Sequence, residues 1–251
     1  MNSTDLAASI ADPVQLVGMS YYFAPSTAEM APNYGLNVFE FYGLGRGGVL
    51  GDVSSDYVFE TFAFFHRNAV EFLWSAARSK ASPDETAQGH IEAAYAYADL
   101  TFGAIAPEVL RAFADAGFKA VDAVESGPYP LVDGYKKFAR PESPVHAAML
   151  AAILLRELRG GVHIDAVNEV GLAYADACYL ADAGLFKLHG YTPEDVPEVT
   201  PELEALKAKA EVITGQLIEK YFDVLSDDER QALHEGAMQM NAAVANPVAV
   251  Q

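Results

Sequence analysis

The residues best suited to chemistry lie in the stretch 21–74, where a few polar side chains are set among aromatic rings. This stretch holds 14 of the 28 aromatic residues of the chain. An apolar cavity with a few polar groups at its wall is the usual form of a small-molecule site. We therefore predict a ligand cavity in this stretch. The residues expected at or near its wall are Tyr42, Arg46, His66, Arg67 and Trp74.

Two other interpretations of these residues stay open. Core packing alone explains most of the rings, and His66 then bridges two helices as a structural histidine. Alternatively, the cavity belongs to an enzyme for a small aromatic or acyl substrate, in which His66 is the acid–base group. Arg46 or Arg67 would then orient an anionic part of the substrate.

The recognisable motifs favour no particular reaction. Residues 43–48 satisfy G-x-G-x-x-G after a strand-like run, but neither a helix start nor alternating strands and helices follow, so we interpret them as a flexible turn. No histidine has another histidine three or four residues later, and no metal site is expected. Cys178 has no base near it in the sequence and is expected to be an inert thiol. The sequence indicates no cofactor.

Composition limits the classes of partner. The formal net charge of −19 opposes binding to phosphate backbones and to anionic lipids, so neither nucleic acid nor membrane is expected as a partner. A single cysteine allows no disulfide within the chain. The first residues lack the features of a signal peptide, and no run of about 18 apolar residues occurs, which makes a cytoplasmic protein the expectation.

Helix signals dominate the elements that must position these residues. Ser82, Ser143, Thr192, Thr200 and Ser226 each begin a capping box or precede a proline at the first helical position. The sequence therefore predicts a mainly α protein. Its helices are expected at 25–33, 54–79, 83–100, 107–124, 144–159, 163–183, 201–225 and 227–245. Gly160-Gly161 and Gly184 are expected to end helices, and short strands are predicted at 37–42 and 185–191.

The Gly- and Pro-rich segment 125–143 is the best candidate for a linker. It separates an aromatic-rich helical half, residues 1–125, which carries the predicted cavity, from a second half, residues 144–251.

The predicted helix 201–225 carries a heptad-like stripe of apolar residues, namely Leu203, Leu206, Ala210, Ile213, Leu217 and Tyr221. A helix packed on its own core is the more common origin of such a stripe, and a helix that pairs across a dimer axis is the alternative. We expect a homodimer held through residues 201–245.

Residues 144–245 resemble a winged-helix module of the MarR type. The order is a helix, the Gly160-Gly161 turn, a second helix, a wing-like stretch at 185–191 and a long helix. Leu225-Ser226-Asp227-Asp228-Glu229-Arg230 is similar to the L-S-x-E-E-R step that opens the last dimerisation helix of such regulators.

The wider chain resembles an actinobacterial, SalK-like family of degenerate helix-turn-helix proteins. The matching stretches are Gly45-Arg46 with Leu50-Gly51, Thr61-Phe62 through Phe65-His66, Leu155 through His163, and Gly171-Leu172. The resemblance implies a winged-helix-derived fold, with room for two related modules, rather than an activity.

The expected recognition helix departs from that of a DNA reader. Such a helix presents cations and hydrogen-bond donors, whereas 163–183 carries four acidic residues and no Lys or Arg. We therefore expect a non-catalytic protein that binds an apolar or aromatic small molecule. An enzyme using the same cavity and a MarR-like transcriptional regulator are the alternatives, and charge disfavours the regulator.

Overall fold

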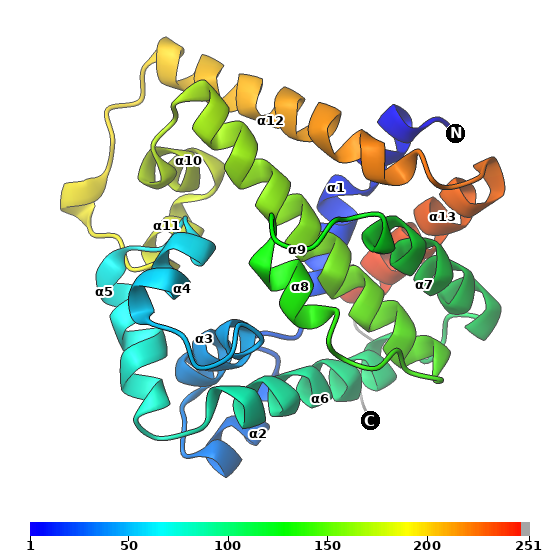
Figure 1. Ribbon diagram of the computed structural model, residues 1–251, viewed down its shortest axis with the longest axis horizontal. Coiled ribbons are helices and arrows are strands. Elements are labelled where there is room, and N and C mark those ends of the chain that lie inside the picture. The colour runs from blue at the N-terminus through cyan, green and yellow to red at the C-terminus, as the bar shows by residue number, and fades with distance from the viewer. Residues whose placement is uncertain (247–251) are drawn as a thin grey trace.

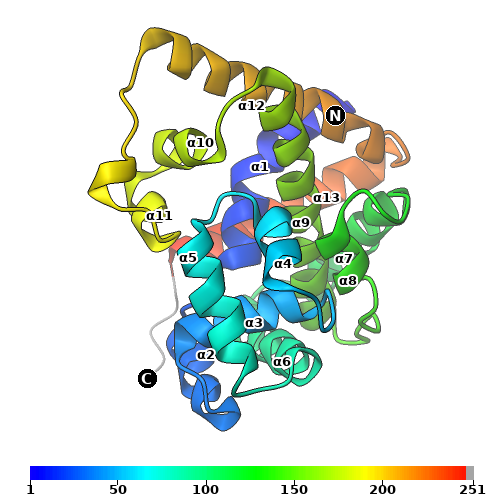
Figure 2. The same ribbon diagram turned by 60° about the vertical axis from the view of Figure 1, so that its left-hand side comes forward.

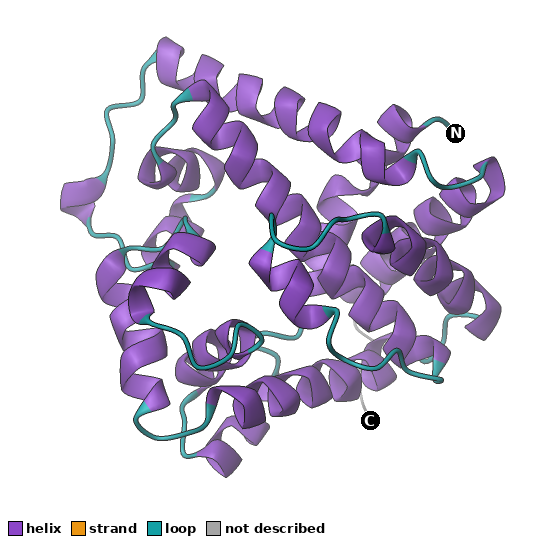
Figure 3. Cartoon of the chain, viewed as in Figure 1, coloured by secondary structure: helices purple, strands orange, loops and turns teal. Residues whose placement is uncertain are grey.

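The computed structural model describes residues 1–246, and its regular structure is helical throughout, which confirms the mainly α prediction (Figure 3). The first seven α-helices are α1 Ser3–Met19, α2 Pro25–Met30, α3 Val38–Gly48, α4 Ser55–Phe62, α5 Arg67–Val70, α6 Pro83–Phe102 and α7 Pro107–Asp122. The later ones are α8 Pro130–Tyr135, α9 Pro144–Val170, α10 Tyr174–Ala181, α11 Ala183–Leu188, α12 Pro201–Phe222 and α13 Asp227–Ala245. Short 3-10 or π turns lie at Ala31–Tyr34, Glu71–Ala76 and Pro193–Asp195.

The long helix α9 runs through the centre of the molecule, and other helices are arranged around it (Figure 1). It packs against α1, α6, α7, α8 and α12. Its middle is apolar on almost every face, and Ala147 through Leu155 are all buried. A helix that is hydrophobic all round belongs inside a protein, and α9 is the axis of this core.

The predicted helix starts are confirmed where a hydroxyl precedes the helix. The side chains of Ser82, Ser143, Thr200 and Ser226 accept backbone N–H groups at the starts of α6, α9, α12 and α13. Each of these bonds satisfies one of the free donors of a helix N-terminus. Thr192 begins only the short 3-10 turn Pro193–Asp195, where its N–H and its hydroxyl both donate to Asp195 Oδ2.

The predicted strand at 37–42 and the flexible turn at 43–48 are wrong, because both stretches belong to α3. Asn37 caps this helix, and Glu40 completes a capping box by accepting the N–H of Asn37 at 3.0 Å. The glycines that resembled a phosphate loop allow close packing instead. A Cβ on Gly45 would lie 2.5 Å from the Cβ of His90 on α6, so only glycine fits there.

The predicted single helix 54–79 is interrupted. α4 ends at Ala63, which adopts φ 54°, and the chain resumes helical form at α5 and continues as the π turn Glu71–Ala76. Residues 63–66 between the two helices place Phe64 and Phe65 against other parts of the molecule, where both rings contact histidines. Aromatic packing therefore overrides helix propensity in this segment.

Gly160-Gly161 does not end a helix, because α9 passes through both residues and stops at Gly171, which has φ 72°. Three residues, 171–173, then lead into α10, so α9 and α10 form a pair of helices joined by a short glycine turn. The second predicted strand, 185–191, is also wrong. It is mostly α11, and the described residues contain no β wing.

One hydrophobic core extends from Leu6 to Met240 and combines residues of both predicted halves. The expected linker 125–143 contains α8, whose Leu131 and Val132 are buried in this core. The heptad-like stripe of α12 also faces its own chain, since Ala210, Ile213 and Tyr221 are buried and α12 packs on α9 and α1. No helix within residues 1–246 is long and apolar enough to cross a membrane.

Candidate functional site

A cavity of about 750 Å³ lies between α3 and α4 on one side and α9 and α10 on the other. In the turned view α4 lies next to α9, and α10 and α11 lie to one side of them (Figure 2). Aromatic side chains form much of the wall, namely Tyr42, Tyr57, Phe62, Phe64, Phe65 and Tyr129. The cavity therefore has both the size and the apolar lining of a small-molecule site.

Three charged residues form a buried cluster at the cavity wall. Arg46 binds Glu157 with two parallel hydrogen bonds, from Nε to Oε1 at 2.9 Å and from Nη2 to Oε2 at 2.7 Å. Arg156 donates from Nη1 to Glu157 Oε1 at 2.6 Å. The side chains of Arg46, Arg156 and Glu157 are 9%, 13% and 1% exposed. We call these residues the Arg–Glu–Arg cluster.

All three groups in the Arg–Glu–Arg cluster are ionised. Burial alone would raise the pKa of Glu157, but the two guanidinium groups outweigh it and hold that pKa below its ordinary value. Burial opposes the charge of Arg46, yet the adjacent carboxylate raises its pKa well above the usual range. Arg46 also lies 4.4 Å from the centre of the Phe62 ring, a cation–π contact that fixes its plane.

Another part of the wall holds the cysteine beside a histidine. Cys178 Sγ is 3.3 Å from His189 Nδ1, and the same nitrogen is 3.1 Å from the backbone oxygen of Phe64. A carbonyl oxygen can only accept, so Nδ1 carries the proton and cannot take one from the thiol. Burial raises the pKa of Cys178 to about 11 and lowers that of His189 to about 4, and both groups are therefore neutral.

Two further polar pairs position side chains at the cavity. Tyr129 donates to Asp165 Oδ2 at 2.9 Å, and its ring lies against Gly161 of α9. His163 Nδ1 is 2.8 Å from the hydroxyl of Thr214 on α12, and burial lowers the pKa of this histidine. These bonds hold the two aromatic rings of this wall in fixed orientations.

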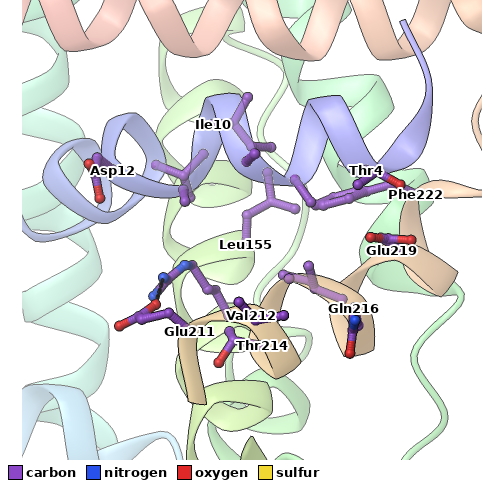
Figure 4. A pocket seen from close by; sticks show the side chains of 17 residues that line it. Thr4, Ile10, Asp12, Leu155, Glu211, Val212, Thr214, Gln216, Glu219 and Phe222 are labelled. Atoms are coloured by element: carbon purple, nitrogen blue, oxygen red, sulfur yellow. Dashed lines mark hydrogen bonds and ion pairs between the residues drawn. The ribbon is translucent and has the colours of Figure 1, made fainter. Parts of the chain in front are cut away.

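A second cavity of about 520 Å³ lies between α1, α9 and α12 (Figure 4). Its lining is mostly small or aliphatic, with Ile10, Leu155 and Val212 among the labelled side chains. Both cavities are lined by Asp12, Arg159 and Glu211, and the Arg159–Glu211 ion pair, at 3.0 Å, lies where they meet. The second cavity lacks the buried charges of the first.

The structure brings two of the five predicted site residues to the larger cavity. Tyr42 and Arg46 line it. His66 is half-buried, caps α5 by accepting the N–H of Asn68 at 3.2 Å, and packs edge-on against Tyr191. Arg67 is exposed and paired with Asp56.

Trp74 is buried behind the wall, with its indole N–H donating to the Val53 oxygen. Gly47 lies between Trp74 and the wall residue Phe62.

Sequence reasoning did not select Arg156, Glu157, Cys178 or His189. Glu157 lies in an ordinary helical stretch, and a buried carboxylate has no local sequence signature. A sequence repeat was available for another wall residue, Arg159, because Arg46-Gly47-Gly48-Val49 recurs as Arg159-Gly160-Gly161-Val162 and both arginines line the cavity. Within residues 1–246, no group of three or more His, Cys, Asp and Glu side chains could hold a metal ion.

Comparison with protein families matches residues 7–251 to a helix-turn-helix family. Comparisons with curated proteins and with solved structures find no match.

Proposed function

The chain belongs to this helix-turn-helix family, and from that premise we propose that it is a small-molecule-binding protein whose ligand, apolar or aromatic, occupies the cavity of about 750 Å³. The single observation that carries this proposal is the cavity itself, walled by aromatic rings and by a buried charged cluster. Ligand sites of this kind measure roughly 300–1,000 Å³ and combine an apolar lining with a few polar groups.

The chemistry of the wall favours binding over catalysis. Cys178 and His189 are adjacent but both neutral, and the proton on His189 Nδ1 faces the Phe64 oxygen. A nucleophilic cysteine needs a thiolate or a base that can accept its proton. His66, the acid–base group of the enzymatic alternative, caps a helix instead of lining the cavity.

The pair α9–α10 is the part of the chain that we equate with the family's helix-turn-helix. Leu172, in the turn between the two helices, is buried with Val167 of α9, Ala177 of α10 and Ala210 of α12. Ala177, Cys178 and Ala181 of α10 also line the cavity. A ligand would therefore touch the second helix of the pair directly.

A transcriptional regulator is the second candidate, and family membership is the observation that favours it. The charge of α10 opposes it, because this helix carries Asp176 and no Lys or Arg. A fluorescence anisotropy titration with genomic DNA fragments decides between them. Specific binding with a Kd near 10⁻⁸ M at physiological salt would establish the regulator, whereas we expect only weak, non-specific association.

The relation to MarR-like and SalK-like proteins, the cytoplasmic location and the homodimer remain part of this proposal. Because the α12 stripe is used inside the chain, a dimer would have to form through other faces of α12 and α13. Val212 on α12, which is 61% exposed, belongs to such a face. Light scattering at micromolar concentration measures the oligomeric state.

Native mass spectrometry of freshly purified protein, followed by thermal-shift screening of aromatic and acyl compounds, tests the proposed function. We expect a bound molecule or a stabilising compound, and we expect Ile164→Trp, which fills the cavity, to abolish both. The matched control is Leu100→Trp on α6, which is exposed and lines neither cavity. Empty protein that no compound stabilises would contradict the proposal.

A further inference from the structure

We propose that the ligand of this cavity carries one negative charge, as a carboxylate, and that Arg156 together with Arg46 binds it. The inference rests on the proposed function and adds the chemical class of the ligand. It follows from three observations on the cavity wall: the charge of the Arg–Glu–Arg cluster, the hydrogen bonds of Arg156, and the state of the neighbouring titratable groups.

The Arg–Glu–Arg cluster has a surplus of one positive charge. It contains two guanidinium groups and one carboxylate, all of them nearly excluded from solvent. Burying a charge is costly unless a partner of opposite sign compensates it. Both arginines belong to the wall of the cavity, so a ligand anion there would neutralise the cluster.

The two arginines differ in how far their donors are used. Each guanidinium lies over an aromatic ring, Arg46 over Phe62 and Arg156 over Tyr22, but Arg46 also uses a whole edge for its two bonds to Glu157. Arg156 makes one side-chain hydrogen bond, to Glu157, and its buried Nε has no partner within the described residues. A guanidinium has five donors in a planar fork that matches a carboxylate, and Arg156 is therefore the residue with capacity to spare.

The other groups near the cluster leave its charge uncompensated. Burial keeps His189 and His90 neutral, with pKa values lowered to about 4 and about 3. Neighbouring tyrosines Tyr21 and Tyr22 are also neutral, because burial raises their pKa values above the usual range. Besides Glu157, four carboxylates line the wall. Asp165 and Glu211 bind Tyr129 and Arg159, and Asp12 and Glu60 are exposed to solvent, which screens their charge.

The rest of the cavity wall indicates the chemistry of the part of the ligand beyond its head group. Phe62, Phe65 and Tyr42 pack on one another at the side of the cavity that carries Arg46, and Phe64 lines the wall near His163. Such rings pack well on flat aromatic or extended acyl groups. The geometry thus points to an aromatic or medium-chain carboxylic acid, with its head group at the Arg–Glu–Arg cluster and its apolar part between the rings.

Calorimetric titration with matched probes tests the inference. We use decanoate against decanamide and 2-naphthylacetate against 2-naphthylacetamide at pH 7.5, since each pair shares its apolar part and differs only in the head group. The carboxylate is expected to bind at least tenfold more tightly than its amide. Arg156→Met should abolish that preference and leave the affinity for the amide within threefold of the wild-type value. Arg156→Lys keeps the charge and should retain part of the preference.

The control is Arg140→Met, which changes the net charge equally but removes an exposed arginine paired with Asp122, away from the cavity. It should leave the preference unchanged. If amides, or the cation decylamine, bind as tightly as the carboxylates, the head-group assignment is wrong although the proposed function stands. If no probe binds and native mass spectrometry shows empty protein, the proposed function itself fails. Should Arg156→Met not fold, the wild-type comparison and Arg156→Lys still decide the question.

Discussion

Arg46 of α3 and Glu157 of α9 lie 111 residues apart in the chain and form a bidentate ion pair inside the protein. The pair joins an N-terminal helix to the central one. Because Glu157 also binds Arg156, two buried cations share one carboxylate at the wall of the cavity.

Removing that carboxylate should therefore destabilise the protein strongly. Glu157→Gln leaves two buried guanidinium groups without a counter-charge, and breaking a buried pair in this way typically costs about 3–5 kcal/mol. Urea denaturation followed by circular dichroism measures the change. Since the pKa of folded Glu157 is lowered, its contribution is present at neutral pH and is lost as the pH falls through that value.

Glu211→Gln is the matched control, because it removes a carboxylate that is 42% exposed and binds Arg159. An exposed pair contributes about 0–1 kcal/mol, and the variant should unfold nearly as the wild type does. Equal stabilities of the two variants would show that the Arg–Glu–Arg cluster does not hold α3 against α9.

His90 should make stability depend on pH. It is 1% exposed, its Nδ1 lies 3.1 Å from the hydroxyl of Tyr21, and burial lowers its pKa to about 3. In the unfolded chain the ring takes a proton near pH 6.5, so acid favours unfolding from that pH down to about 3. Between pH 7.5 and 5 this residue alone should reduce the free energy of unfolding by about 2 kcal/mol.

Comparing variants isolates that contribution from those of other groups. His90→Gln should flatten the pH dependence by about that amount, whatever its effect at pH 7.5. His146→Gln replaces a histidine that packs flat on Tyr95 and is 29% exposed, and it serves as the control. If the free energy of unfolding depended on pH in His90→Gln as it does in the wild type, His90 would also take up its proton in the folded protein.

Gly160 and Gly161, adjacent residues of α9, should respond oppositely to alanine. A Cβ on Gly160 would meet no atom within 4 Å, whereas one on Gly161 would lie 2.4 Å from Cδ1 of Tyr129. Alanine favours a helix interior over glycine by up to about 1 kcal/mol, so Gly160→Ala should stabilise the protein. Gly161→Ala should cost about 1–3 kcal/mol, since Tyr129 is buried and held by Asp165. Thermal denaturation of both variants measures the difference, and stabilisation by both would contradict the packing of Tyr129 on α9.

The same glycines show what a sequence can predict of this fold. Capping signals are local, and the starts of α6, α9, α12 and α13 could be predicted from residues within one turn of each helix. Gly160-Gly161 indicates a helix end by propensity alone, but its role depends on the Tyr129 ring, which comes from a loop 32 residues earlier. Tertiary packing decides such positions.

The residues of the candidate site also fall into those that the sequence could predict and those that it could not. Tyr42 and Arg46 could be predicted because aromatic density and an isolated arginine mark a site within one stretch of sequence. Arg156 and Glu157 could not, because their role arises from contact between helices far apart in the chain. His66 was selected for its residue type, while its backbone position makes it a helix cap.

The reactivity of Cys178 tests whether the cavity holds an activated nucleophile. Its pKa is raised to about 11 by burial, so only about 0.1% is thiolate at pH 8, against roughly a quarter for a free thiol. Because the thiolate is the nucleophile, iodoacetamide should alkylate the folded protein at least about 100-fold more slowly than the urea-unfolded chain. Mass spectrometry follows the reaction without ambiguity, since the chain has one cysteine.

His189→Gln then tests whether His189 acts as a base on the Cys178 thiol. With its Nδ1 proton donated to the Phe64 oxygen, His189 does not activate the thiol, and the variant should be alkylated at a rate within a few-fold of the wild type. A compound that occupies the cavity should slow the reaction further, because Cys178 lines the wall. If the folded wild type instead reacts as fast as the unfolded chain, and His189→Gln abolishes that reactivity, the two residues form a thiolate–imidazolium pair. The enzymatic alternative would then replace the binding protein proposed above, with Cys178 as its nucleophile.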